Sequence, residues 1–98
     1  MKHYSREDGG LEQICDALLQ LRTQDEARRF LLDLCSVQEL NAMGQRLEVA
    51  QMLSEGMIYS KIVQLTGASS ATISRVSRAL QSNDGGIRLV LERLEEDQ

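Results

Sequence analysis

Residues 59–80 constrain the fold of this chain more than any other stretch. They read as two short helices joined by a tight turn at Gly67, where a residue without a Cβ adopts left-handed backbone at least cost. Ser69 and Ser70 follow where the second helix needs an N-cap, because a hydroxyl accepts from the free N–H groups of a first helical turn. Apolar residues recur at helical spacing in both segments, at Ile62, Val63 and Leu65 and then at Ile73, Val76, Ala79 and Leu80. The pattern predicts a helix-turn-helix.

The positions between the apolar residues of the second helix carry small hydroxyls and two guanidinium groups, with no acid among them. This composition is typical of a helix that enters a DNA major groove. Lys61, Arg75 and Arg78 are expected to contact phosphates or guanine edges, and Ala71 is expected to contact a thymine methyl group. The full set of expected DNA contacts, hydroxyl residues included, is Ser60, Lys61, Ser69, Ser70, Ala71, Thr72, Ser74, Arg75 and Arg78.

Charge is distributed unevenly along the chain. The 98 residues hold 11 Lys and Arg against 15 Asp and Glu, which gives a net charge of −4. Residues 56–83 contain three bases and no acid, so this segment carries +3 and the rest of the chain carries −7. An acidic chain with one carboxylate-free segment is consistent with phosphates approaching that segment. The competing interpretation is a turn that lies between two helices by chance in a small helical domain.

The composition favours an all-α fold. The chain has no proline and few aromatic residues, so its core must come from aliphatic and Met side chains, as in packed helices. Besides the helix-turn-helix, periodicity and caps predict helices at 11–22, 24–35, 37–55 and 87–96, with a turn at 82–86. The long helix is expected to be buried on two sides. We expect residues 1–10 to be flexible and residues 11–98 to form a single helical domain.

Chain length also bears on oligomeric state. A chain of 98 residues, divided into short helices, buries little apolar surface on its own. Dimerisation is therefore expected, and a symmetric DNA site would match a homodimer.

The two cysteines point to no metal or disulfide chemistry. Cys15 and Cys35 lack a CxxC spacing, and the single histidine, His3, lies near the N-terminus. We expect buried free thiols in a cytoplasmic protein. The first residues lack the apolar core of a signal peptide, and no apolar run is long enough to span a membrane. No Cys/His or Ser/His/Asp set and no glycine-rich phosphate loop is present, so an enzyme is not expected.

Two motifs carry a family resemblance. They are 44–46 (GQR) in the long helix and 67–75 (GASSATISR) in the helix-turn-helix, and the run that contains both covers nearly half of the chain. In these motifs the chain resembles the Trp repressor superfamily, and within it the small TrpR-like branch called YerC/YecD. The resemblance implies a six-helix fold, an intertwined homodimer, a recognition helix at 70–80 and operator binding by a repressor.

The same resemblance implies a corepressor site. In the family two arginines sandwich the indole of tryptophan; Arg46 and Arg75 stand at the matching motif positions, and Ser36 stands where a hydroxyl residue contacts the ligand. Val76 replaces a glycine of the tryptophan-responsive repressor, and Ala79 replaces a serine that helps to hold the ligand's amino group. These departures argue against tryptophan and leave a different small-molecule corepressor open. The alternative role for Arg46 is a salt bridge with a glutamate of its own helix.

Two functional hypotheses follow. The leading one is a sequence-specific DNA-binding transcriptional regulator that acts as a homodimer on double-stranded DNA, with no metal and no cofactor other than such a corepressor. The alternative is a helical protein-interaction module that has kept the fold and lost specific DNA binding. The acidic remainder of the chain favours the second hypothesis, whereas the agreement of turn, cap, apolar spacing and charge in residues 59–80 favours the first.

Overall fold

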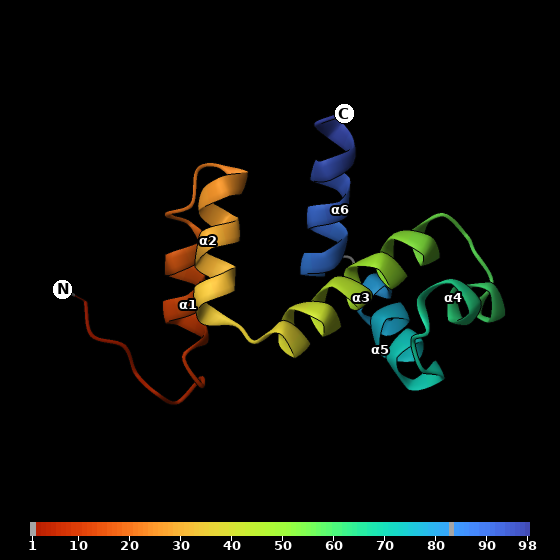
Figure 1. The fold of residues 1–98 in the computed structure, drawn as a ribbon, viewed down its shortest axis with the longest axis horizontal. Coiled ribbons are helices and arrows are strands. Elements are labelled where there is room, and N and C mark those ends of the chain that lie inside the picture. The colour runs from red at the N-terminus through yellow and green to blue at the C-terminus, as the bar shows by residue number, and fades with distance from the viewer. Residues whose placement is uncertain (1, 83) are drawn as a thin grey trace. The chain divides into compact units, whose positions relative to one another are not determined.

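The computed structural model describes residues 2–82 and 84–98, which form six helices and no strand (Figure 1). The predicted all-α class is confirmed. Met1, in the segment predicted to be flexible, and Asn83, in the predicted turn, lie outside the described residues. The helices are α1 (Leu11–Leu18), α2 (Gln24–Leu34), α3 (Val37–Ser54), α4 (Tyr59–Thr66), α5 (Ser70–Gln81) and α6 (Gly86–Glu96).

α1 is shorter than predicted, and local hydrogen bonds hold both its end and the start of α2. The Thr23 hydroxyl accepts from the Glu26 N–H at 3.1 Å and so caps α2. The Glu26 carboxylate in turn accepts from the Arg22 N–H at 2.9 Å. After Leu18 the N–H groups of Gln20 and Leu21 donate to carbonyls three residues back, at 3.0 and 3.2 Å, so the α-helical pattern stops and α1 ends at Leu18 rather than at residue 22.

The chain divides into two compact units, Met1–Val37 and Gln38–Gln98, which are called the first and the second unit below. The first unit contains α1 and α2, and the second contains all but the first residue of α3 together with α4, α5 and α6. The single helical domain over residues 11–98 stays a prediction.

The segment before α1 contacts that helix. The Lys2 ammonium lies 2.9 Å from a Glu12 carboxylate oxygen and 3.3 Å from one of Asp16. The Tyr4 hydroxyl donates to Asp16 at 2.8 Å, and the Lys2 ammonium lies 5.0 Å from the centre of the Tyr4 ring. The segment is therefore tied to α1 by polar contacts at the surface, and its flexibility stays a prediction.

Apolar side chains in the first unit are largely exposed. Neither α1 nor α2 contains a buried residue, and Leu19 is 80% exposed. Both thiols are free, but Cys15 is exposed and Cys35 is half-buried. The prediction of a buried thiol was wrong for Cys15, because the apolar face of α1 on which it lies is left uncovered by the rest of its unit.

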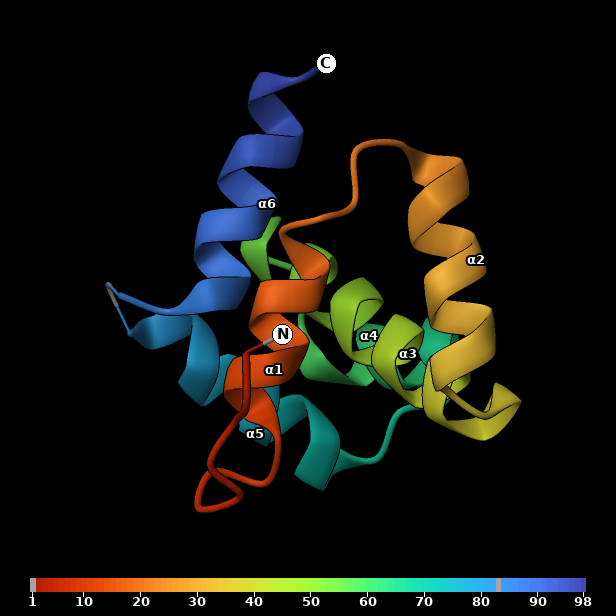
Figure 2. The ribbon, with the colours of Figure 1, turned by 90° about the vertical axis from the view of Figure 1, so that its left-hand side faces the viewer.

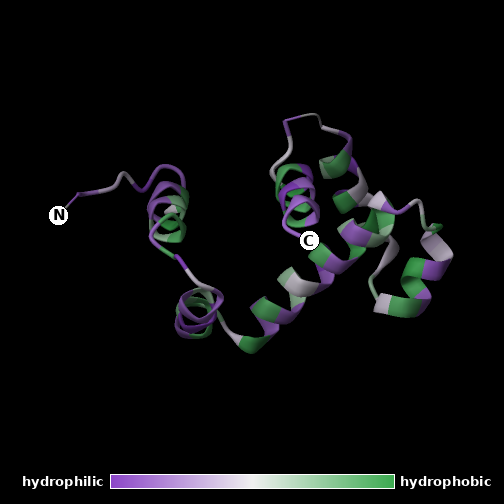
Figure 3. Ribbon diagram, turned by 90° about the horizontal axis from the view of Figure 1, so that it is seen from above, coloured by the Kyte–Doolittle hydropathy of each residue, from purple (hydrophilic) through white to green (hydrophobic). Residues whose placement is uncertain are grey.

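The second unit holds a small hydrophobic core. The fully buried residues of this core come from α3, α4, the following turn and α5, and they are Val49, Ala50, Ile62, Ala68, Ile73 and Val76. In α5 the predicted inward positions Ile73 and Val76 are confirmed, and Ala79 and Leu80 are half-buried. Figure 3 shows that hydrophobic and hydrophilic residues alternate along α3, which contributes to this core.

The buried face of α4 is narrower than the apolar face predicted from the sequence. Ile62 is buried, but Val63 and Leu65 are 42% and 51% exposed. At 100° per residue these three side chains span about 160° of the helix circumference. The core covers only the part of this face that carries Ile62, and Val63 and Leu65 on either side of it remain exposed.

The long helix α3 is buried along part of its length only. Val49 and Ala50, in its C-terminal half, are fully buried, whereas Val37 is 68% exposed and Leu47 is also exposed. Burial on two sides was therefore wrong for the N-terminal half of α3 in a single chain.

The last helix completes the second unit. α6 runs in a different direction from α5 (Figure 2), and Ile87 and Leu91 pack against the core. Over residues 2–82 and 84–98, none of the helices has both the length and the apolar character that crossing a membrane requires.

Candidate nucleic-acid interface

The turn between α4 and α5 has the predicted backbone geometry. Gly67 adopts φ 72°, and its N–H donates to the Val63 carbonyl at 2.8 Å, which ends α4. The Thr66 hydroxyl donates to the Ile62 carbonyl at 2.7 Å and accepts from the Ala68 N–H at 3.1 Å. Backbone groups at the end of α4 are thus satisfied locally, and the turn is held in one conformation.

Ser69 caps α5, as predicted. Its backbone is extended, and its hydroxyl oxygen accepts from the Thr72 N–H at 3.1 Å. The same hydroxyl donates to the Thr72 hydroxyl at 3.0 Å. The N-terminus of α5, which favours a negatively charged ligand, is therefore capped by neutral groups and carries no acid in its first turn.

A side chain of α3 fixes the end of α4. The side-chain amide of Gln45 donates to the Thr66 carbonyl at 3.2 Å. Gln45 is half-buried and lies in one of the two motifs that carried the family resemblance, but its sequence context gives no sign of a partner 21 residues away. Sequence reasoning therefore missed this residue as part of the framework of the helix-turn-helix.

One face of α5 points away from the core. Ala71, Ser74, Arg75 and Arg78 share a side of the helix because they lie at i, i+3, i+4 and i+7. The buried Ile73 and the other inward residues occupy the opposite side. We call Ala71, Ser74, Arg75 and Arg78 the outward face of α5.

The residues predicted to contact DNA all lie on α4, α5 or the cap between them. Their exposure fits contact with a large partner, since none is buried. The exposed members are Ser60, Lys61, Ser69, Ser70, Ala71, Arg75 and Arg78, and the half-buried members are Thr72 and Ser74.

The charged groups of this region are cationic. Lys61, Arg75 and Arg78 are the charged side chains of residues 56–82, and each is exposed. In the part of the chain that the structure describes, the ion pairs involve Lys2, Arg28 and Arg29 rather than these three. Their charges are thus not offset by a neighbouring carboxylate, which suits an approaching phosphate.

The residues of the predicted corepressor site fall in both units. Ser36 is exposed and belongs to the first unit, while Arg46 is half-buried on α3 and Arg75 is exposed on α5. A shared ligand site for these three residues stays a prediction. Val76, which stands where the tryptophan-responsive repressor has a glycine, is 2% exposed and belongs to the hydrophobic core.

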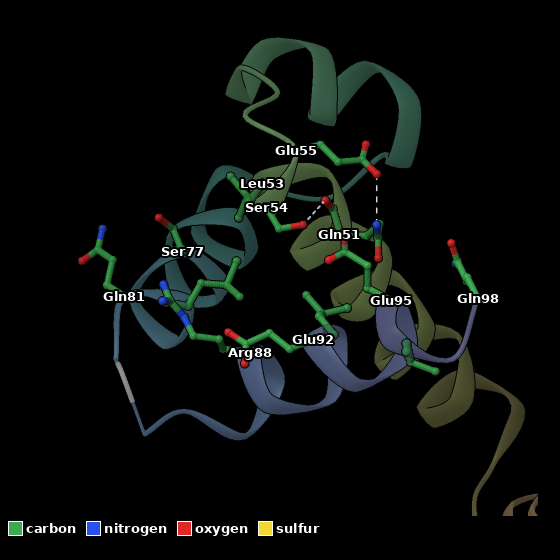
Figure 4. Close-up of a pocket in the computed structure, with 13 residues that line it drawn as sticks. Gln51, Leu53, Ser54, Glu55, Ser77, Gln81, Arg88, Glu92, Glu95 and Gln98 are labelled. Atoms are coloured by element: carbon green, nitrogen blue, oxygen red, sulfur yellow. Dashed lines mark hydrogen bonds between the residues drawn. The ribbon is translucent and has the colours of Figure 1, made fainter.

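A cavity of about 770 Å³ lies elsewhere in the second unit, between the end of α3, α5 and α6 (Figure 4). Gln51, Glu55, Ser77, Gln81 and Arg88 are among the residues that line it. It contains none of the residues predicted to contact DNA or a corepressor.

Comparison with known proteins assigns the family. Residues 9–95 match the family model of the Trp repressor protein. The uncharacterized protein YerC of Bacillus subtilis strain 168 is 45% identical over 86 residues, which are 88% of this chain and 83% of that protein.

Two solved structures share the fold. A candidate Trp repressor from Staphylococcus aureus is 41% identical with a TM-score of 0.79, over 89% of this chain and 87% of that one. A TrpR-like protein from Eubacterium eligens ATCC 27750 is 45% identical with a TM-score of 0.79, over 89% of this chain and 90% of that one. The fold and the resemblance predicted from the sequence are confirmed, and the chain belongs to the Trp repressor family.

Proposed function

We propose that this protein is a sequence-specific DNA-binding transcriptional regulator, a repressor that acts as a homodimer on double-stranded DNA. The observation that carries the proposal is the outward face of α5, which presents two guanidinium groups and a hydroxyl with no carboxylate in residues 56–82. Arginine side chains on one face of a helix suit base edges and phosphates in a major groove. Membership of the Trp repressor family supports the same reading.

The exposed apolar residues support a homodimer. Large apolar side chains that are scattered singly need no explanation, but here they line several helices of both units. Burying such faces against a second copy would complete a core that one chain builds only in part. The members on the first three helices and the segments between them are Leu11, Ile14, Leu18, Leu19, Leu32, Leu34, Val37, Met43 and Leu47.

The proposal includes a small-molecule corepressor, but one other than tryptophan. Arg46 and Arg75 would hold it, with Ser36 as a further contact. The burial of Val76 in the core argues for a ligand other than tryptophan, because the valine side chain fills space that a glycine would leave open.

Selection of bound sequences from a random duplex pool, with and without tryptophan, tests the function. We expect a palindromic consensus in both arms, since a homodimer presents two recognition helices related by symmetry. Enrichment only with tryptophan would contradict the proposal that the corepressor is a ligand other than tryptophan. No enrichment in either arm would contradict sequence-specific binding by the protein alone, and would favour a protein-interaction module or a requirement for a corepressor other than tryptophan.

The variant Arg75→Ala assigns the DNA contact to α5. We expect it to abolish binding to the selected sequence in a mobility-shift titration, with the mass of the oligomer unchanged in light scattering. Arg93→Ala is the matched control, because Arg93 is an exposed arginine near the end of α6 and outside the helix-turn-helix. Equal binding by Arg75→Ala and the wild-type protein would contradict the assignment.

A further inference from the structure

The C-terminal end of α5 is tied to α6 by an arginine. The guanidinium of Arg88 donates twice to the Leu80 carbonyl, from Nε at 3.1 Å and from Nη2 at 2.6 Å. Arg88 is half-buried, and both bonds cross the connection between the two helices. A charged donor makes a stronger hydrogen bond than a neutral one, and two donors from one planar group also fix its orientation.

The acceptor of these bonds is a carbonyl that lacks a donor within its own helix. The last four carbonyls of an α-helix have no partner within the helix, and α5 ends at Gln81, so the Leu80 carbonyl is one of them. The end of a helix also carries partial negative charge, which a guanidinium complements. Arg88 therefore satisfies the end of α5 from outside that helix.

A second contact at the same joint involves Gly85. Its N–H donates to the Ser82 carbonyl at 3.2 Å. A Cβ at this position would lie 2.8 Å from the Ala79 carbonyl oxygen, closer than a side chain tolerates, and 3.2 Å from the Ser82 carbonyl oxygen. Gly85 thus lies tightly against the end of α5, and the start of α6 is held close to it.

We propose that Arg88 is a positioning residue for DNA recognition, because it fixes the direction of α5 relative to α6. This inference rests on the proposed function. Base readout requires the outward face of α5 to meet base edges at a defined angle, whereas contacts with phosphates tolerate small rotations. A change in the joint would therefore reduce sequence-specific binding more than non-specific binding.

The first test measures the joint itself without DNA. In the wild-type dimer we expect a scalar coupling across the hydrogen bond from Arg88 Nε to the Leu80 carbonyl carbon, detected by NMR. Arg88→Met keeps an unbranched apolar stem and removes both donors. Residual dipolar couplings of backbone amides should then show α5 reoriented against α6 in Arg88→Met and unchanged in Arg93→Met, which alters an exposed arginine of the same helix. An unchanged orientation in Arg88→Met would overturn the proposal.

The second test measures binding to the selected sequence and to an unrelated duplex. We expect Arg88→Met to lose about tenfold in specific affinity, the equivalent of one charge-assisted hydrogen bond, with non-specific affinity unchanged. Arg88→Lys, which keeps a cation and one donor, should recover part of the loss, and Arg93→Met should match the wild-type protein. An equal loss on both duplexes, with no rescue by lysine, would indicate fold support only and would overturn the proposal.

The two tests separate this inference from the proposed function. If the wild-type protein selects no DNA sequence, sequence-specific binding by the protein alone fails and the recognition role of Arg88 fails with it. The dipolar couplings still establish in that case whether Arg88 sets the direction of α5. If the wild-type protein selects a sequence and Arg88→Met keeps the full specificity ratio, only the inference about Arg88 fails.

Discussion

The side-chain amide of Gln45 donates to the backbone carbonyl of Thr66 at 3.2 Å, and this bond joins the middle of α3 to the last residue of α4. The carbonyl belongs to the last turn of a helix, where no partner within the helix exists. The helix-turn-helix is thus anchored to the long helix by a polar contact as well as by the hydrophobic core.

Removing the Gln45 amide should destabilise the protein. Gln45→Leu keeps a similar volume and leaves the half-buried Thr66 carbonyl without its partner, so we expect a loss of about 1 kcal/mol in the free energy of unfolding. Urea titration at fixed protein concentration measures it. Gln51→Leu is the control, because the Gln51 amide donates to Glu55 on the exposed surface and its loss should stay within about 0.5 kcal/mol. Equal losses in the two variants would contradict a specific role for Gln45.

Local features of the helix-turn-helix could be predicted from the sequence because their causes lie within a few residues. Gly67 has positive φ, and Ser69 caps the helix that starts one residue later. Both outcomes depend on backbone sterics and on one short hydrogen bond. The inward positions Ile73 and Val76 follow in the same way from helical periodicity.

Contacts between elements could not be predicted in this way. Whether Val63 is covered depends on where α4 meets α3 and α5, which periodicity does not specify. The partner of Gln45 lies 21 residues away, and the bonds from Arg88 to Leu80 depend on how the chain bends after α5. For the candidate site, the sequence therefore identifies the outward face of α5 but not the contacts that hold it in place.

Substitution of Ser69 should separate its capping role from DNA binding. Ser69→Ala removes the acceptor for the Thr72 N–H, so we expect a loss of about 1 kcal/mol in the free energy of unfolding. Ser69→Asp restores an acceptor and places negative charge at a helix N-terminus, so stability should return to the wild-type level or above it. The same carboxylate should weaken DNA binding, because it would repel an approaching phosphate.

Thermal unfolding and mobility-shift titration of the same samples measure the two effects. Ser70→Ala is the control for stability alone, since Ser70 is an exposed residue of the first turn and its loss should leave stability within about 0.5 kcal/mol. DNA binding by Ser69→Asp at wild-type strength would place this end of α5 away from the phosphates.

The contact of the N-terminal segment with α1 should depend on pH. Hydrogen bonds from Tyr4 and then Lys2 lower the pKa of Asp16 below its ordinary value of 3.8. The hydrogen bond to Asp16 raises the pKa of Tyr4 above 10.0, and bonds to Glu12 and then Asp16 raise that of Lys2 above 10.5. A lowered carboxyl pKa stabilises the contact above pH 3.8, and this contribution is lost as pH falls through the lowered pKa.

The raised pKa of Tyr4 makes the contact depend on pH in the opposite direction. Its contribution is complete below pH 10.0 and is lost as pH rises through the raised pKa. We therefore expect the contact to be intact between pH 3.8 and pH 10.0, and to open only as pH falls through the lowered pKa of Asp16 or rises through the raised pKa of Tyr4. NMR shifts of the Tyr4 ring across a pH titration measure it, and Asp16→Asn should abolish the acid-side transition. An acid-side transition that persists in Asp16→Asn would assign it to another carboxylate.

Arg78 should contact a phosphate rather than a base. It lies one full turn beyond Ser74 on the outward face, towards the C-terminal end of α5, whereas base readout by a recognition helix concentrates near its N-terminus. Arg78→Ala removes two cations from a homodimer, so the slope of log affinity against log salt should become less steep by about 1.8. Affinity should fall on all duplexes alike.

Salt titrations of the selected sequence and of an unrelated duplex, by fluorescence anisotropy, measure this slope. Arg93→Ala removes the same charge from α6, outside the helix-turn-helix, and should leave the slope unchanged. A phosphate contact positions the protein without reading sequence, so the preference at each operator position should survive Arg78→Ala. Relaxed preference at one position with an unchanged slope would instead place the Arg78 guanidinium on a base edge, in the pairing that arginine makes with guanine.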